Sequence, residues 1–195
     1  MVDKISKEEV RNLPRVVFKG RIIVVSTEKE SEKAVDYLQS FPLLGFDSET
    51  RPAFHKGKLY QVALIQLSTE DTCFLFRLNK IGFPDSLADL LANQQIKKVG
   101  LSLKDDFSVI RRREREFKPE GFIELQSYVK KFGIEEAGLQ RIYAILYGKK
   151  ISKSQRLSNW EQEQLTDAQK MYAAIDAWAC LKIYDKLSSL IKLDE

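Results

Sequence analysis

The sequence predicts an α/β or α+β domain in which helices flank a mixed β-sheet. Apolar and β-branched runs dominate the first half, helical patterns dominate the second half, and at least one strand–helix–strand alternation occurs. With 195 residues, of which 44% are hydrophobic and 31% charged, the chain is large enough for one domain with a full core. Because no repeat or flexible linker interrupts the sequence, we expect a polar arm over residues 1–14 and a single domain over residues 15–195.

Most of the predicted strands lie in the first half of the chain. β-Branched residues at 15–27 predict one or two strands, and residues 28–40 have the composition of a helix. The segment LLGFDSE at 43–49 is the next predicted strand. Apolar runs at 60–69 and 71–78 are separated by the polar sequence STED, which predicts a hairpin.

The second half is mainly helical. We expect a short helix at 86–94, a buried strand at 97–103 and a helix at 104–116 whose distal end is charged. Two further short helices are predicted at 121–133 and 138–148, because each pattern stops at a glycine.

The last predicted helix has the clearest signals. Thr166 is followed three residues later by Gln169, which is the spacing of a capping box. The segment then continues to residue 193 without proline or glycine, so we expect one long helix.

Charge and composition limit the classes of function. The net charge of +4 and the isoelectric point of about 8.9 are compatible with a polyanionic partner without requiring one. The only histidine, His55, lies in a loop segment beside Gly57 and is expected to be exposed. A histidine-based metal site or a Ser/His/Asp triad is therefore excluded unless His55 is the base.

The cellular compartment is predicted from the cysteines and from the lack of targeting signals. Cys73 and Cys180 lie far apart and outside any motif, so we expect free thiols in a reducing compartment. The first ten residues carry no apolar signal core, and no apolar run is long enough to span a bilayer. These observations predict a cytoplasmic protein with no membrane partner.

Two carboxylates end the predicted strand at 43–49. Asp47 and Glu49 are two residues apart, so both side chains project from the same face of that strand. Neighbouring like charges repel, and burial disfavours the ionised forms. A positive counter-charge is expected beside them.

Three further residues place polar groups on apolar helical faces. Asp106 follows the strand at 97–103 and shares a helical face with apolar residues three and four positions further on. Asp105 is the alternative candidate at this place, but its face of the helix is more polar. In the last helix, Tyr172 and Asp176 are four residues apart and are neighbours on one face.

Each of these patterns has a simpler alternative. An Asp-x-Glu sequence at a strand end is often turn or capping chemistry, and an acid in a first helical turn often complements the helix dipole. A Tyr/Asp pair at helical spacing is often a surface hydrogen bond. The combination of all three patterns in one chain favours a functional interpretation.

The combination resembles the three exonuclease motifs of the DEDDy family of 3′–5′ exonucleases. The matching segments are FDSE at 46–49, VGLSLKDDFSVI at 99–110 and YAAIDAWACLKIY at 172–184. With the flanking sequences, the resemblance extends over roughly residues 20–190, and it is closer to the Werner-type exonuclease domain than to ribonuclease D. At the second motif it selects Asp106 over Asp105.

The resemblance implies a ribonuclease H-like fold and a site for two divalent cations, Mg²⁺ or Mn²⁺. In this family pattern, Asp47 bridges both ions, Glu49 and Asp176 complete the site that activates water, and Asp106 acts on the second ion through its water shell. Tyr172 would orient the attacking water. The implied product is a nucleoside 5′-monophosphate, released from a strand that retains a 3′-hydroxyl.

One position departs from the family pattern. Werner-type sequences carry a tryptophan two residues after the second aspartate, whereas here Asp106 is followed by Phe107 and Ser108. Phe107 could stack on a terminal base, but an apolar residue on this helical face is more often part of the core.

A basic segment at 148–160 precedes the last helix. We expect it to hold the phosphate backbone of a nucleic acid, and the alternative is a solvated connector. The candidate residues are the cations Lys149, Lys150, Lys153 and Arg156 and the hydrogen-bond donors Ser154 and Asn159.

Three functional hypotheses follow, of which the first is preferred. The first is a metal-dependent 3′–5′ exonuclease acting on DNA, and the second is the same chemistry on RNA, as in ribonuclease D. The third is a catalytically silent module that only binds nucleic acid. The sequence leaves open whether a helicase or repair partner resides on a separate chain.

Overall fold

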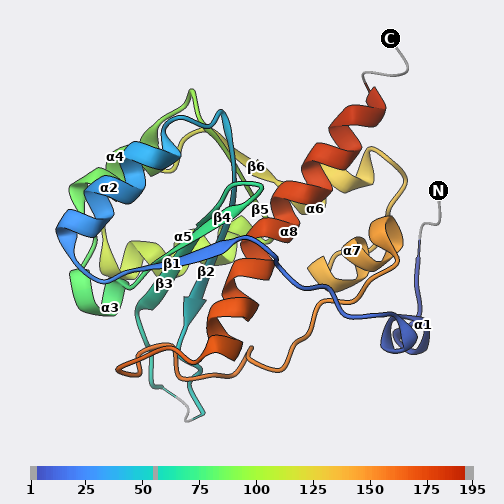
Figure 1. Cartoon of the computed structure of the whole chain (residues 1–195), viewed down its shortest axis with the longest axis horizontal. Helices are drawn as coiled ribbons and strands as arrows, with labels where there is room; N and C mark the ends of the chain where they lie inside the picture. Colours follow the sequence, from blue (N-terminus) through green and yellow to red (C-terminus); the bar gives the residue numbers. More distant parts are fainter. Residues whose placement is uncertain (1–3, 55–56, 192–195) are drawn as a thin grey trace.

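The computed structural model describes residues 4–54 and 57–191, which contain a six-stranded mixed sheet with helices on both faces (Figure 1). The strand order is β1-β4-β3-β2-β5-β6. Strand β3 pairs antiparallel with β2 and β4, and the other neighbours are parallel. The strands are β1 (Arg21–Val25), β2 (Leu43–Thr50), β3 (Val62–Ser68), β4 (Thr72–Phe76), β5 (Lys97–Gly100) and β6 (Phe122–Glu124).

Two hydrophobic clusters divide the helices between the faces of the sheet. One cluster lies under α2 (Glu28–Leu38), α3 (Leu78–Ile81), α4 (Asp85–Ala92) and α5 (Leu103–Arg113). The other lies under α6 (Leu125–Lys130), α7 (Leu139–Tyr147) and the long α8 (Asp167–Ile191), which crosses the sheet in Figure 1. The short helix α1 (Lys7–Asn12) lies beside α7.

The predicted class, a mixed sheet flanked by helices, is confirmed. The helix at 28–40 corresponds to α2, and the hairpin at 60–78 corresponds to the antiparallel pair β3 and β4. The expected capping box is present, because the Thr166 amide donates to the Gln169 side chain (3.0 Å) and the Gln169 amide donates to the Thr166 hydroxyl (3.2 Å). Cys73 and Cys180 are free, as expected, and both are buried.

Of the one or two strands expected at 15–27, one is present, at Arg21–Val25, and Arg15 makes an isolated bridge to Lys150. One segment differs from the prediction. Residues 121–133 were expected to be one helix, but Phe122–Glu124 form β6, which pairs parallel with β5. The partner of this short strand is distant in sequence, so local helical propensity is overridden by tertiary pairing.

Some expectations lie beyond what the structure tests. His55 lies outside the described residues, and the boundary between an arm at 1–14 and a domain at 15–195 stays a prediction. Within that arm, residues 7–12 form α1, and Val10 is buried. Among the described residues, no helix combines the length and hydropathy needed to cross a membrane.

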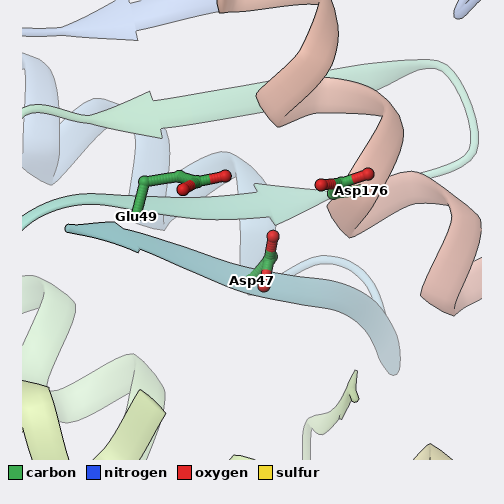
Figure 2. Close-up of side chains that lie close together, drawn as sticks. All are labelled: Asp47, Glu49 and Asp176. Carbon is green, nitrogen blue, oxygen red and sulfur yellow. The ribbon is translucent and has the colours of Figure 1, made fainter. Parts of the chain in front are cut away.

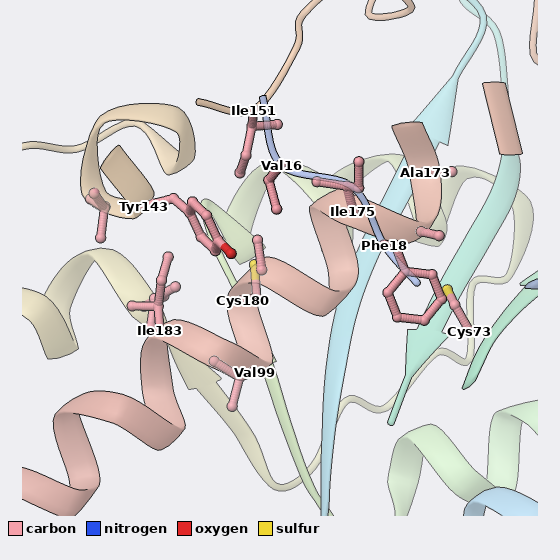
Figure 3. Packing of buried hydrophobic residues seen from close by; sticks show 14 of the residues in the cluster. Val16, Phe18, Cys73, Val99, Tyr143, Ile151, Ala173, Ile175, Cys180 and Ile183 are labelled. Carbon is pink, nitrogen blue, oxygen red and sulfur yellow. The ribbon is translucent and has the colours of Figure 1, made fainter. Parts of the chain in front are cut away.

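The core beneath α8 places this helix directly on the sheet (Figure 3). Its buried face carries small residues, including Ala173, Ala177 and Cys180, and β2 presents Gly45 to it. A Cβ atom at Gly45 would lie 2.0 Å from the carbonyl oxygen of Ala177. The glycine therefore permits an approach that any larger residue would prevent, and it fixes the distance between β2 and α8.

We expect Gly45→Ala to lower the melting temperature by several degrees. The added methyl group meets backbone rather than a movable side chain, and overpacking of this kind costs about 1–3 kcal/mol, or about 2–4 °C per kcal/mol in a chain of this size. Thermal denaturation followed by circular dichroism measures the change. Gly138→Ala is the matched control, because a Cβ there meets no atom within 4 Å; equal melting temperatures for the two variants would contradict the prediction.

Candidate active site

Strand β2 and helix α8 bring three carboxylates together. Gly45, Asp47 and Glu49 occupy every second position of β2, so their side chains lie on one face of the sheet, which is the face that α8 covers. Asp176 precedes Ala177, the residue that α8 packs against Gly45. Each of Asp47, Glu49 and Asp176 offers one oxygen, and these oxygens lie within 4.8 Å of one another (Figure 2). The close contact between α8 and β2 therefore creates the cluster.

Asp106 approaches this cluster from α5. It lies outside the group of oxygens within 4.8 Å, although it contributes to the raised pKa of Asp47. The Ser48 hydroxyl donates a hydrogen bond of 2.5 Å to the Asp106 carboxylate. Ser48 alternates with Asp47 along β2, so it reaches the α5 face of the sheet. Asp105, the alternative candidate, is exposed.

Glu124 positions the first turn of α5, and the sequence interpretation missed it. Its carboxylate accepts hydrogen bonds from the amides of Ser102 (3.1 Å) and Leu103 (2.8 Å), and a carboxylate is favourable at a helix N-terminus. Ser102 adopts a left-handed conformation with φ of 63°, which is unusual for a residue other than glycine. This turn sets the direction of α5 and hence the position of Asp106.

Tyr172 lies one helical turn before Asp176, and the two residues line one cavity. Burial, followed by the negative charges of Asp176 and Glu49, raises the pKa of the Tyr172 hydroxyl far above its usual value. The phenol therefore remains neutral. Its ring lies 6.0 Å from that of Trp160, which is fully buried and restricts the tyrosine from the side of the loop before α8.

The carboxylates have strongly perturbed pKa values. Burial, followed by repulsion from neighbouring carboxylates, raises the pKa of Asp47 and Glu49 well above their ordinary values. Burial also raises the pKa of Asp106 and Asp176 to about 7 each, even though contacts with Ser48 and Tyr172 favour the ionised forms. Such a cluster relieves its repulsion either by retaining protons or by binding cations.

The donor set fits hard divalent cations. All the ligands on offer are carboxylate oxygens, which suit Mg²⁺ and Mn²⁺. Two Mg–O bonds in line span about 4.2 Å. The carboxylate oxygens lie within 4.8 Å of one another, so small side-chain rotations would bring them into coordination range of one ion.

Gln66, which pairs with Asp47 across β2 and β3, is buried, and neither polar atom of its side-chain amide has a hydrogen-bond partner within the described part of the chain.

Phe107 is half-buried on α5. Its ring packs edge-to-face with Phe117 (5.6 Å) and Phe122 (4.9 Å). These contacts favour the core interpretation over base stacking.

The basic segment at 148–160 is only partly directed at the acids. Lys153 and Arg156 line a cavity of about 450 Å³ together with Tyr172 and Asp176. Their positive charges lower the pKa of Asp176 and Glu49, respectively, against the effect of burial.

The other candidates in this segment lie away from that cavity. Lys149 and Ser154 are exposed, and the Lys150 ammonium donates to the carbonyl oxygen of Arg11. The Asn159 side chain accepts a hydrogen bond from the Glu161 amide. The binding roles of all six residues stay predictions.

The fold and the acidic cluster define a ribonuclease H-like domain of the DEDDy type. The Nibbler EXO domain of Aedes aegypti superimposes with a TM-score of 0.82 at 23% identity, over 92% of this chain and 94% of that one. Escherichia coli RNase D superimposes with a TM-score of 0.77 at 24% identity, over 87% of this chain and 44% of that one.

The chain belongs to the 3′–5′ exonuclease family, whose sequence model matches residues 22–192. The "Bifunctional 3'-5' exonuclease/ATP-dependent helicase WRN" of Mus musculus is 36% identical over 190 residues. That match covers 92% of this chain but only 13% of the mouse protein. A "3'-5' exonuclease" of Arabidopsis thaliana is 30% identical over 202 residues, covering 95% of this chain and 70% of the plant protein.

Proposed function

We propose that this protein is a metal-dependent 3′–5′ exonuclease that removes nucleoside 5′-monophosphates from DNA. The observation that carries the proposal is the convergence of Asp47, Glu49 and Asp176, with Tyr172 one helical turn away and with Asp106 approaching from α5. Membership of the family supplies the reaction class.

The acids would hold two divalent cations, with Asp47 shared between them. Glu49 and Asp176 would complete one cation site. Asp106 would contribute to the other, since its carboxylate lies outside the group of oxygens that are within 4.8 Å of one another. When bound, such ions acidify water and stabilise the attacking and leaving oxygens of an in-line displacement. Ser48 orients Asp106 through its hydrogen bond. The second site also depends on the turn at the start of α5, because that turn sets the position of Asp106.

The reaction consumes one water at the terminal phosphodiester. The water oxygen forms a bond to phosphorus, and the bond between phosphorus and the 3′-oxygen of the preceding nucleotide breaks. That oxygen takes up a proton and becomes the new 3′-hydroxyl, while the departing nucleotide keeps its 5′-phosphate. Lys153 and Arg156 line the same cavity as Tyr172, where they would hold the phosphate in place.

Tyr172 would orient the attacking water rather than remove its proton. Its hydroxyl remains protonated because burial and the neighbouring carboxylates raise its pKa. We expect Tyr172→Phe to lower kcat by about 10–100-fold with little change in KM, as for the loss of one orienting hydrogen bond. Steady-state kinetics on a labelled oligonucleotide measure the effect, and an unchanged kcat would contradict this role.

The preference for DNA over RNA rests on sequence likeness. The WRN protein of mouse is 36% identical to this chain, whereas RNase D of E. coli, an exoribonuclease by its description, is 24% identical. Recognition of a 2′-hydroxyl would distinguish the two polymers. An RNA substrate is therefore the alternative.

A single assay tests the proposal. The purified protein is incubated with Mg²⁺ or Mn²⁺ and with 3′-recessed DNA, single-stranded DNA and single-stranded RNA of matched sequence. We expect stepwise shortening of DNA from the 3′ end and release of nucleoside 5′-monophosphates. Faster shortening of RNA would replace the preferred substrate with the alternative. No shortening of any strand, together with oligonucleotide binding that ignores metal ions, would indicate a catalytically silent module.

A further inference from the structure

A second cavity continues from the candidate active site toward the N-terminal helix. It has a volume of about 610 Å³ and is bounded by α1, by the segment before α7 and by the start of the basic segment. It adjoins the cavity that contains Tyr172 and Asp176 because the two share lining residues. The shared residues are Ala137, Gly138, Gln140, Ile151, Ser152 and Lys153.

We call the second cavity the arm groove, and its lining is strongly basic. Among the described residues that line it, only Glu136 is acidic, and its carboxylate accepts two hydrogen bonds from Arg141, of 3.0 and 2.9 Å. The remaining charges are therefore positive. The basic residues that line the arm groove are Lys7, Arg11, Arg15, Arg141, Lys150 and Lys153.

Lys7 and Arg11 lie on the arm and Arg15 directly follows it, and this part of the chain is fixed to the rest of the domain. The backbone amides of Val16 and Lys150 donate to the carbonyl oxygens of Lys150 (3.0 Å) and Pro14 (2.9 Å), respectively. The Lys150 ammonium also donates to the carbonyl oxygen of Arg11. On α1 itself, Val10 is buried against the domain. The backbone of this segment is therefore fixed beside the groove, and it places Lys7, Arg11 and Arg15 along the lining.

Three of these cations have no ion-pair partner in the described part of the chain. Lys7, Arg11 and Arg15 are exposed, and no carboxylate lies within 4 Å of their charged groups among residues 4–54 and 57–191. Aligned cations without counter-charges repel one another, and a polyanion relieves that repulsion. A series of phosphates would match a row of such groups better than a single small anion.

We propose that the arm groove binds the phosphodiester backbone of the single strand that leads into the active site, with Lys7, Arg11 and Arg15 contacting its phosphates. The direction of this strand rests on the proposed exonuclease function, because the nucleotide to be removed would occupy the cavity at Tyr172. The strand upstream of it then enters the adjoining groove. Phosphate contacts of this kind position a strand without reading its sequence.

Equilibrium binding tests the proposal. Fluorescence anisotropy is measured in EDTA with labelled single strands of about twelve nucleotides and with a dinucleotide, over a range of salt concentrations. The variant combines Lys7→Gln, Arg11→Gln and Arg15→Gln, and it leaves Lys150 in place to secure the arm. Loss of three contacts should make the slope of log affinity against log salt shallower by about 2, at about 0.7 for each phosphate on a single strand.

A charge-matched control separates the groove from the general effect of net charge. Lys29 and Lys33 on α2 and Lys118 near α4 are exposed and lie on the other side of the molecule from α1 (Figure 1). Changing all three to glutamine removes the same charge. We expect the arm variant to bind the longer strand about tenfold more weakly than this control, with a smaller difference for the dinucleotide.

The outcomes distinguish this proposal from the proposed function. Equal affinities and equal salt slopes for the arm variant and the control would overturn the proposal that the arm groove binds the strand. Parallel runs with DNA and RNA identify the polymer: equal losses mean that the groove contacts phosphates of either, and a loss with one alone assigns the groove to that polymer. If the wild-type protein shortens no strand but the arm variant loses affinity, the exonuclease proposal fails and the groove stands.

Discussion

Asp47→Asn is expected to lower kcat/KM for exonuclease activity by about 10³-fold or more. Asp47 is the central member of the cluster: its pKa is raised by burial, then by Asp106, Glu49 and Asp176 in turn. Neutralising it removes the ligand proposed to be shared by two cations, whose combined effect on the displacement exceeds that of a single hydrogen-bond donor. Stepwise shortening of a labelled strand at saturating Mg²⁺ or Mn²⁺ measures the loss.

The same substitution should stabilise the metal-free protein near pH 8. It removes a half-buried carboxyl group whose ionisation is opposed by burial and by three neighbouring carboxylates, so the folded state no longer bears that repulsion. A rise of a few degrees in melting temperature is expected, at about 2–4 °C per kcal/mol. Loss of activity with gain of stability is typical of a site whose residues are arranged for function at the expense of folding.

Asp105→Asn provides the control for both measurements. Asp105 is exposed and neighbours Asp106 on α5, so the substitution makes an identical chemical change close to the site. We expect activity close to that of the wild type. If the control loses as much activity as Asp47→Asn, or if Asp47→Asn retains activity, the assignment of the cluster is wrong.

Local periodicity was sufficient to predict the relation between Asp47 and Glu49 and between Tyr172 and Asp176. Alternation along a strand places the first pair on one face, and a spacing of four places the second pair on one side of a helix. Periodicity does not state that β2 and α8 touch. The resemblance to a family supplied that connection, and Gly45 shows the physical basis of the contact.

The supporting residues could not be found in this way because their partners are distant in sequence. Glu124 accepts hydrogen bonds from residues more than twenty positions earlier, and Gln66 meets Asp47 only through the pairing of β2 with β3. Strand β6 was missed for the same reason. Ser48 had one local signal, its place between two acids, but its contact with Asp106 depends on the packing of α5.

The arm was also underestimated from its composition. A polar segment with few apolar residues predicts little structure, yet one buried side chain, Val10, and the backbone bonds of Lys150 fix it to the domain. Its position beside the basic segment becomes visible only when the sequence is folded. Two stretches of cations that are more than 130 residues apart then line one groove.

The stability of the metal-free protein is expected to fall as pH rises from about 5 to about 8. Burial raises the pKa of Asp106 and Asp176 from 3.8 to about 7. Between these values the folded state retains protons that the unfolded chain has released, so the stabilising effect of protonation is lost as pH passes through the folded pKa. The pKa values of Glu9, Glu30 and Glu163 are lowered, so these groups change the stability only near or below pH 4.5, which is outside the range from pH 5 to pH 8.

Divalent cations should oppose this fall, because they bind the ionised carboxylates. At a concentration of about 100 times Kd, binding adds about 2.7 kcal/mol, and the gain should increase with pH as the acids lose their protons. Melting temperatures measured in EDTA and in millimolar Mn²⁺ across this pH range give both slopes. Asp176→Asn should flatten the slope in EDTA and reduce the shift caused by Mn²⁺, whereas Asp105→Asn, which removes only a minor cause of the raised pKa of Asp106, should change both far less. A melting temperature that is independent of pH in EDTA and unaffected by Mn²⁺ would mean that these acids neither repel one another nor bind cations, and the proposed chemistry would lose its physical basis.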